Sequence, residues 1–363
     1  MSARGGVRPP LRFVSEEASR HKRSEQRARV SSARAALEQA VHLLGLGKAP
    51  GTRDQPGQSG GVGAKAYYAP RDRAVFLVVD DATPYAGELA ALSVAHEYVH
   101  ALQDASGELL AALDGDETRS FDQELTLWGA FEGEAALYEE VVRALLHDRD
   151  PRAGLLERFA ARTRGTDEAI LRQARPLEAS FATFPYTYGA YWAALETQQP
   201  ASTQQILAIR HEWRPSESQR CVDESPTSLA PGYPRRARDT LGAWLVQAYV
   251  GRLARDPERA RSAARRWRGD WISLYWRALG EAPSFIWQTC WDSAPTALEM
   301  RELVEAQLQG SAGDRAWAPA ARRAWVSNHE HRVTLTVRAE DFAELAANVG
   351  PAGHGVAGGA SDP

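Results

Sequence analysis

The chain has 363 residues, of which 44% are hydrophobic and 25% charged, and its formal net charge is −4 at pH 7. This length can bury a substantial core, and the composition is that of an ordinary soluble globular protein. The small net charge and the lack of a recognition motif argue against nucleic acid as a partner. The sequence contains no run of about 18 apolar residues, so no membrane span is predicted.

The N-terminal residues are basic but lack the apolar stretch of a signal peptide, which predicts a cytoplasmic protein. The chain has two cysteines, Cys221 and Cys290, without the paired spacing of a zinc ribbon or redox motif. We interpret them as two buried free thiols, with a disulfide as the alternative. A disulfide would favour export, so export stays open.

In chain order, residues 24–46 predict a helix whose apolar face carries Leu37, Val41 and Leu44. Residues 51–64 are rich in Gly, Pro and Ser and predict a flexible linker. Residues 66–70 and 74–80 are rich in β-branched and aromatic side chains, and they predict a hairpin around a Pro-Arg-Asp turn.

Two long helices follow the hairpin. The first is expected to begin with Thr83 as its N-cap and Pro84 inside its first turn, and to run to about Gln103. The second is expected to begin at Ser120, where Gln123 completes a capping box, and to continue to about His147.

Beyond these helices, residues 212–235 are rich in Pro and Ser and predict an irregular break, after which a helix, two Trp-rich strands and further helices are expected. The predicted fold is α+β and dominated by helices. The expected units are an N-terminal helix with a linker (1–62), a catalytic core (63–215), a C-terminal α+β subdomain (236–345) and a disordered tail (346–363).

The main chemical signal is the sequence His96-Glu97-Tyr98-Val99-His100. Residues at i and i+4 share one face of a helix, so His96 and His100 can bind one zinc ion while Glu97 lies beside it. The alternative is a pair of structural histidines with a surface glutamate.

Glu132 is the best candidate for a third ligand. It interrupts an apolar stripe at three- and four-residue steps, so its carboxylate should face the core, where it needs a cation or an ion pair. Glu134 competes for this role, but it lies about 200° away around a helix. An arginine partner for Glu132, with no metal, is the remaining alternative.

These residues resemble the gluzincin metallopeptidases, in which H-E-x-x-H is followed on a later helix by a glutamate ligand. Phe-Glu132-Gly-Glu-Ala is similar to the N-E-G-F-A segment of aminopeptidases in that group. A family of uncharacterised bacterial metallopeptidases is also similar over residues 65–340. The segments that carry this likeness are HEYVHALQD, EGEA, PYTYG, STQQIL, WRGD and WD.

The resemblance implies a zincin-like core and one Zn²⁺ per chain. One departure stands out, because Ala136 occupies the position where related enzymes have an aspartate that orients a zinc-bound histidine. Support for the ligands must therefore come from other residues.

The resulting prediction is a zinc metallopeptidase that acts on a peptide or protein substrate. Zinc would activate a water molecule, and Glu97 would accept its proton and pass it to the leaving amine. Tyr186, Tyr188 and His211 are candidate donors to the oxyanion. The alternatives are a catalytically inactive zincin-like protein that binds a peptide or partner, and a zinc hydrolase of a non-peptide amide or ester.

Overall fold

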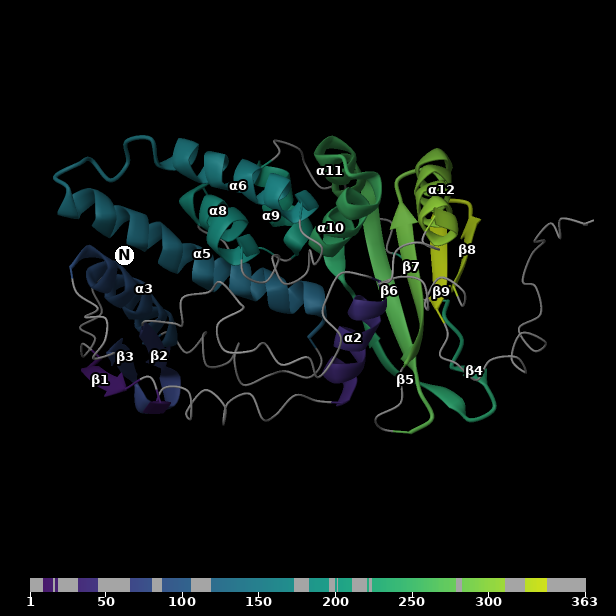
Figure 1. The fold of residues 1–363 in the computed structure, drawn as a ribbon, viewed down its shortest axis with the longest axis horizontal. Coiled ribbons are helices and arrows are strands. Elements are labelled where there is room, and N and C mark those ends of the chain that lie inside the picture. The colour runs from purple at the N-terminus through teal and green to yellow at the C-terminus, as the bar shows by residue number, and fades with distance from the viewer. Residues whose placement is uncertain are drawn as a thin grey trace, which may run out of the picture.

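Figure 1 shows the arrangement of the elements in the computed structural model, which is helix-rich and of the predicted α+β class. The residues that the structure describes are 9–15, 17–18, 32–44, 66–79, 87–105, 119–172, 183–195, 200, 202–210, 221, 224–278, 283–310 and 324–337. Several sequence predictions lie outside them, namely the helix start at Thr83 and Pro84, the linker 51–64, His211 and the tail 346–363.

A three-stranded sheet lies at one end of the molecule (Figure 1). Strands β2 (Ala66–Ala69) and β3 (Ala74–Val79) form the predicted antiparallel hairpin around the 3-10 turn η1 (Pro70–Asp72). Strand β1 (Leu11–Ser15), which the sequence pattern did not predict, pairs in parallel with the other edge of β3. The central strand β3 is buried along nearly its whole length, as its continuous apolar run requires.

Two long helices carry the predicted chemistry. Helix α3 (Glu88–Ala105) packs against the hairpin strands and against α5 (Phe121–Leu146). Helix α5 begins with the predicted capping box, in which the Ser120 side chain accepts from the Gln123 amide and the Gln123 side chain accepts from the Ser120 amide. Both helices are therefore confirmed, but α3 begins at Glu88, directly after Gly87 with its positive φ of 72°, and not at the predicted Pro84.

Shorter helices follow α5 and lie along one side of it (Figure 1). These are α6 (Leu155–Arg172), the π-helical turn η2 (Pro185–Gly189), α8 (Ala190–Leu195) and α9 (Thr203–Arg210). The turn η2 continues directly into α8 and packs closely on α5.

The C-terminal part contains a six-stranded antiparallel sheet with strand order β4-β5-β6-β7-β9-β8. Its strands are β4 (Ser228–Ala230), β5 (Tyr233–Asp239), β6 (Trp267–Tyr275), β7 (Ser284–Trp291), β8 (Ala324–His329) and β9 (Arg332–Val337). The predicted Trp-rich strands are β6 and β7. The irregular break predicted at 212–235 is wrong at its end, because β4 and the start of β5 lie there and pair with each other.

Helices also pack against this sheet. They are α10 (Gly242–Ala254), α11 (Pro257–Arg266) and α12 (Ala294–Gly310), of which α10 and α12 contact its central strands. Within the described residues, no helix is both long and apolar enough to cross a membrane.

One hydrophobic core joins the two main units that the sequence suggested. Trp244 on α10 packs against Phe184 and Tyr188 at η2, with ring centroids 4.9 Å apart in each case. The same core includes the apolar face of α2 (Ser32–Leu43), whose Leu37 and Val41 are buried as predicted. Helix α5 and the C-terminal sheet therefore fold around shared side chains.

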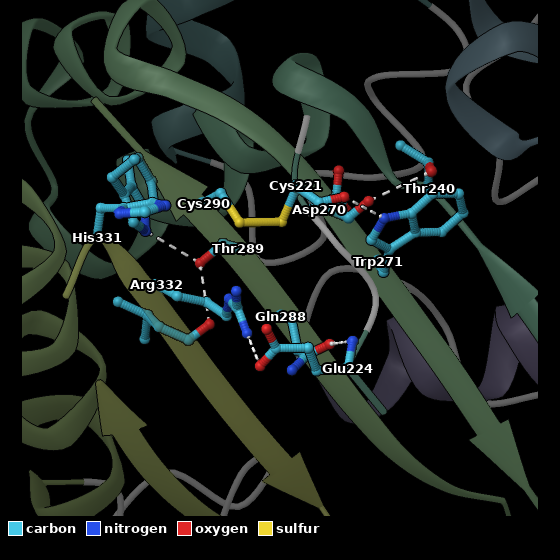
Figure 2. The surroundings of a disulfide bond; sticks show 12 residues. Cys221, Glu224, Thr240, Asp270, Trp271, Gln288, Thr289, Cys290, His331 and Arg332 are labelled. Atoms are coloured by element: carbon cyan, nitrogen blue, oxygen red, sulfur yellow. Dashed lines mark hydrogen bonds and ion pairs between the residues drawn. A yellow bond between two sulfur atoms is a disulfide. The ribbon is translucent and has the colours of Figure 1, made fainter. Parts of the chain in front are cut away.

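The two cysteines form a disulfide, so the prediction of two free thiols is wrong. Figure 2 shows the bond, which ties Cys221 to Cys290 on β7. Cys221 lies close to Gly269 on β6, and the Trp271 indole N–H donates to the Cys221 carbonyl over 2.7 Å. The two cysteines lie 69 residues apart in sequence, and only the pairing of the strands between them brings them together.

Candidate metal centre

His96 and His100 lie one helical turn apart on the same side of α3. Both residues are buried, and their ring centroids are 4.9 Å apart. The i, i+4 spacing places the two imidazoles on one face of the helix. The structure thus brings the first two predicted ligands together.

The apolar side chains of α3 are only partly buried. Leu92 and Val99 are buried, whereas Leu89 and Leu102 are 67% and 63% exposed. The buried stripe of α3 is narrower than the sequence pattern indicates, and the two histidines occupy part of it.

Glu132 on α5 completes the group. Its Oε2 atom lies 3.0 Å from Nε2 of His96 and 3.5 Å from Nε2 of His100. One ligand atom from each of the three residues falls within 4.8 Å of the others. Glu132 therefore faces the histidines from the neighbouring helix, as its place in the apolar stripe predicts.

Glu134, the competing ligand in the sequence, has a different partner. Its Oε2 accepts a hydrogen bond of 2.9 Å from Nε2 of Gln103. Oε1 of Gln103 in turn lies 2.8 Å from Nδ1 of His100. Glu134 is thus connected to the centre through Gln103 and is not part of the three-residue group.

A second carboxylate supports His96. Nδ1 of His96 lies 3.5 Å from Oε2 of Glu139, and the other oxygen of Glu139 accepts a 3.1 Å hydrogen bond from Arg143. Glu139 lies seven residues after Glu132, two turns along α5, and so it faces the same side. Glu139 and Gln103 supply the support that Ala136 cannot give. Gln103 lies three residues after His100, and Glu139 lies seven residues after Glu132. This helical spacing from the predicted ligands could have identified both residues in the sequence.

Glu97, the predicted general base, lies beside the three-residue group. Its Oε2 accepts a hydrogen bond of 2.7 Å from the backbone amide of Tyr68 on β2. Burial raises its pKa, while the charges of the neighbouring histidines oppose that shift. A raised carboxyl pKa suits a group that must accept and then release a proton near neutral pH.

Tyr186 is brought to the centre by η2. Its ring stacks on His96 with centroids 5.9 Å apart, and burial together with the nearby charge of Glu132 raises the pKa of its hydroxyl. The residue is 40% exposed, so it also contacts solvent. Of the three predicted oxyanion donors, the structure brings Tyr186 alone to the described centre.

Tyr188 lies elsewhere, so its predicted oxyanion role is withdrawn. It is fully buried in the core between Phe184 and Trp244, and its hydroxyl donates to Asp167. The two tyrosines of this turn point to different sides of it. His211 falls outside the described residues, and its role stays a prediction.

Close backbone packing positions Tyr186 against α5. A methyl group at Gly133 would overlap the carbonyl carbon of Gly189, and one at Gly189 would overlap the carbonyl oxygen of Gly129. Only glycine allows two backbones to approach this closely. The glycines of EGEA and PYTYG therefore bring η2 into contact with the helix that carries Glu132.

The electrostatics of the group favour a cation between its members. Burial alone would lower the pKa of His96, but hydrogen bonds with Glu132 and Glu139 outweigh it and raise that pKa to about 10. Burial would raise the pKa of Glu132, yet the two imidazoles hold it below its usual range. A carboxylate enclosed in this way needs positive charge nearby.

The donor set fits a zinc ion. Among the described residues, Glu132 contacts the imidazoles of His96 and His100, and no arginine forms an ion pair with it. Both histidines present Nε2 to the carboxylate while their Nδ1 atoms face other side chains. Two imidazoles, one carboxylate and such secondary partners are typical of catalytic zinc sites.

Comparison of the chain with models of known protein families, with curated proteins and with solved structures found no match.

Proposed function

We propose that the protein is a zinc-dependent hydrolase that cleaves peptide bonds. The observation that carries this proposal is the convergence of His96, His100 and Glu132 on one position, with Glu97 from the same helix beside them. The resemblance to gluzincins leads to the same proposal, but the side-chain geometry supports it without that resemblance.

Each residue of the centre has a chemical role in this proposal. His96, His100 and Glu132 would hold zinc, which supplies Lewis acidity when bound. Glu97 takes a proton from the attacking water and delivers it to the leaving nitrogen. Tyr186, as a protonated phenol, donates a hydrogen bond to the oxyanion that develops on the substrate.

The position of β2 supports a peptide substrate. In the described sheet, β2 is an edge strand that pairs with β3 on one side. Its other side faces α3, because the Tyr68 amide donates to Glu97. Apart from the Tyr68 amide, which Glu97 already engages, an edge strand can pair its outer backbone groups with an extended peptide, and an isolated ester or amide lacks such a repeating partner.

Zinc content and peptide cleavage, measured on the same samples, test the proposal. Elemental analysis should find one zinc per chain in the wild type and in Glu97→Gln, and much less in Glu132→Ala. The wild type should cleave a quenched-peptide library in a chelator-sensitive manner. Glu97→Gln should lose at least about 10²-fold in rate while it keeps its zinc, because it removes the base and no ligand.

Other results would favour the alternatives. Zinc binding with hydrolysis of small amides or esters, but of no peptide, would replace the peptidase with a different zinc hydrolase. A wild-type protein that binds no zinc and cleaves nothing would instead indicate an inactive peptide- or partner-binding protein.

The disulfide also bears on the compartment. Disulfides persist in oxidising compartments and are rare in the cytosol. We infer from the Cys221–Cys290 bond that the protein works outside the reducing cytoplasm, contrary to the sequence prediction. Thiol titration of unfolded protein, isolated from its natural source without reductant, should detect no free thiol. Two free thiols would restore the cytoplasmic interpretation.

A further inference from the structure

A buried polar relay connects His100 to α5. Gln103, one turn after His100 on α3, is 8% exposed. Its Oε1 lies 2.8 Å from Nδ1 of His100, and its Nε2 donates to the Phe131 carbonyl over 3.1 Å and to Glu134 over 2.9 Å. The side-chain amide therefore interacts with the helix that carries Glu132.

The partners of Gln103 fix which way its amide points. The Phe131 carbonyl can only accept a hydrogen bond, so it must face the NH₂ group. A flipped amide would place its oxygen against two acceptors and leave the NH₂ group facing His100. The observed orientation is therefore the one that satisfies all three contacts, and it turns Oε1 toward His100.

This orientation in turn fixes the tautomer of a neutral His100. Because the oxygen of Gln103 can only accept, Nδ1 of His100 must carry the hydrogen. Nε2 is then left with its lone pair, and it faces Oε2 of Glu132 at 3.5 Å. A metal ligand requires that lone pair.

We propose that Gln103 is a positioning residue that holds His100 as its Nδ1–H tautomer, with Nε2 directed to the metal, and that Glu134 holds Gln103 in turn. This inference rests on the proposed function, since it concerns the same zinc centre. It assigns a role to Glu134, which the sequence offered only as a competing ligand. The contrasting possibility is that the relay merely ties α3 to α5 and stabilises the fold.

Metal affinity separates the two roles. Gln103→Met keeps the length of the side chain but cannot accept from His100, and we expect zinc to bind about 10- to 100-fold more weakly. Zinc dissociation constants are measured by competition with a chromophoric chelator. In the Co²⁺-loaded protein, the exchangeable Nδ1–H proton signal of His100 should be present in the wild type and lost or broadened in Gln103→Met, because the proton loses its acceptor.

A double variant that exchanges the amide and the carboxylate between positions 103 and 134 tests whether zinc affinity can be restored. In the double variant Gln103→Glu plus Glu134→Gln, a carboxylate at position 103 still accepts from His100, and an amide at position 134 donates to it. Net charge is unchanged, so part of the lost zinc affinity should return, even though the carboxylate at position 103 no longer donates to the Phe131 carbonyl. If the Gln103 hydrogen bonds only hold α3 against α5, zinc affinity should not depend on whether position 103 carries an acceptor for His100.

Gln247 on α10 provides a matched control. It is also a buried glutamine, 4% exposed, but its Nε2 donates to Asp167 in the core. Gln247→Met should lower thermal stability and leave zinc affinity unchanged. If Gln103→Met binds zinc as tightly as the wild type, the positioning role is overturned while the zinc centre stands. If the wild type binds no zinc, the proposed function fails, and this inference fails with it.

Discussion

The Tyr186 ring stacks on His96, and its hydroxyl feels the charge of Glu132. Burial raises the pKa of this phenol, so it stays protonated and remains a donor at neutral pH. Removing one oxyanion donor typically costs about 10²- to 10³-fold in kcat. We expect Tyr186→Phe to lose about this much in kcat on a cleaved peptide and to retain its zinc, as measured by steady-state kinetics and elemental analysis.

Tyr188→Phe is the matched control, because it removes a hydroxyl from the same turn. That hydroxyl donates to buried Asp167. Losing one buried hydrogen bond should lower the free energy of unfolding by about 1–3 kcal/mol without changing kcat. An unchanged kcat in Tyr186→Phe would remove Tyr186 from the mechanism. Equal losses of kcat in both variants would indicate a general disturbance of the turn.

At the scale of secondary-structure elements, the contact between α5 and η2 depends on Gly133. A methyl group there would overlap backbone atoms of Gly189 and Ala190, which cannot move aside as a flexible side chain can. Overpacking of this kind costs about 1–3 kcal/mol or more, which exceeds the roughly 1 kcal/mol that alanine gains in a helix. We expect Gly133→Ala to lower the free energy of unfolding in a denaturant titration and to weaken zinc binding through the adjacent Glu132.

Gly165 on α6 offers the opposite case. It is also a helical glycine, but a methyl group at this position would meet nothing within 4 Å. Gly165→Ala should therefore stabilise the protein by about 0.5–1 kcal/mol. If both variants shifted stability in the same direction, helix propensity rather than the close backbone approach would account for the Gly133 result.

Local sequence patterns predicted the elements whose formation depends mainly on contacts between residues close in sequence. The capping box at Ser120 and Gln123 marked the start of α5, and the turn between two apolar runs marked the β2–β3 hairpin. Helical spacing also placed the two histidines on one face of α3 and turned Glu132 inward on α5. These patterns involve residues that lie close in sequence or share one helix face, whereas the meeting of Glu132 with the histidines depends on the packing of α3 against α5.

Features that depend on distant pairing were not predicted. Strand β1 is short and acquires its role only beside β3, and β4 lies in a stretch whose Pro and Ser content suggests a loop. The disulfide requires β6 and β7 to pair before Cys290 can meet Cys221. Tyr186 and Tyr188 could not be separated from sequence, because their directions depend on the π-helical turn and its contact with α5.

For the whole molecule, two buried carboxyl groups lie where α5 and α9 meet the C-terminal unit. Asp122, near the start of α5, accepts hydrogen bonds from the side chain and backbone of Thr203 on α9, and the Thr203 hydroxyl accepts from the Trp244 amide on α10. Asp270 on β6 accepts from the Leu241 and Gly242 amides at the start of α10. Burial raises the pKa of both Asp122 and Asp270 to about 6.

These raised pKa values should make the stability of the protein depend on pH in a defined direction. A carboxyl group whose pKa is higher in the folded state than in the unfolded chain holds its proton more tightly when folded. Its stabilising contribution is complete below the unfolded pKa, 3.8 for aspartate, and is lost as the pH rises through the folded value of about 6. Between these two pH values, the free energy of unfolding should therefore fall as the pH increases.

Asp122→Asn tests this dependence, because asparagine keeps an oxygen acceptor for Thr203 and carries no charge. Asp270 suits the test less well, since its several N–H donors would meet the amide NH₂ of an asparagine. A two-unit pKa shift corresponds to at most about 3 kcal/mol. We therefore expect Asp122→Asn to be more stable than the wild type by about 1–3 kcal/mol at pH 8, with the difference shrinking toward zero at pH 4.

Urea titrations of both proteins at pH 4, 6 and 8 give this difference directly, and subtraction cancels the titration of groups far from Asp122. Asp150→Asn, at an exposed aspartate, is the control and should leave the pH dependence of stability as it is in the wild type. A stability difference for Asp122→Asn that does not change with pH would mean that Asp122 has the same pKa in the folded and unfolded chain. The Thr203 hydrogen bonds would then offset the cost of burying the charge, and the stability of the protein would be insensitive to pH at this position.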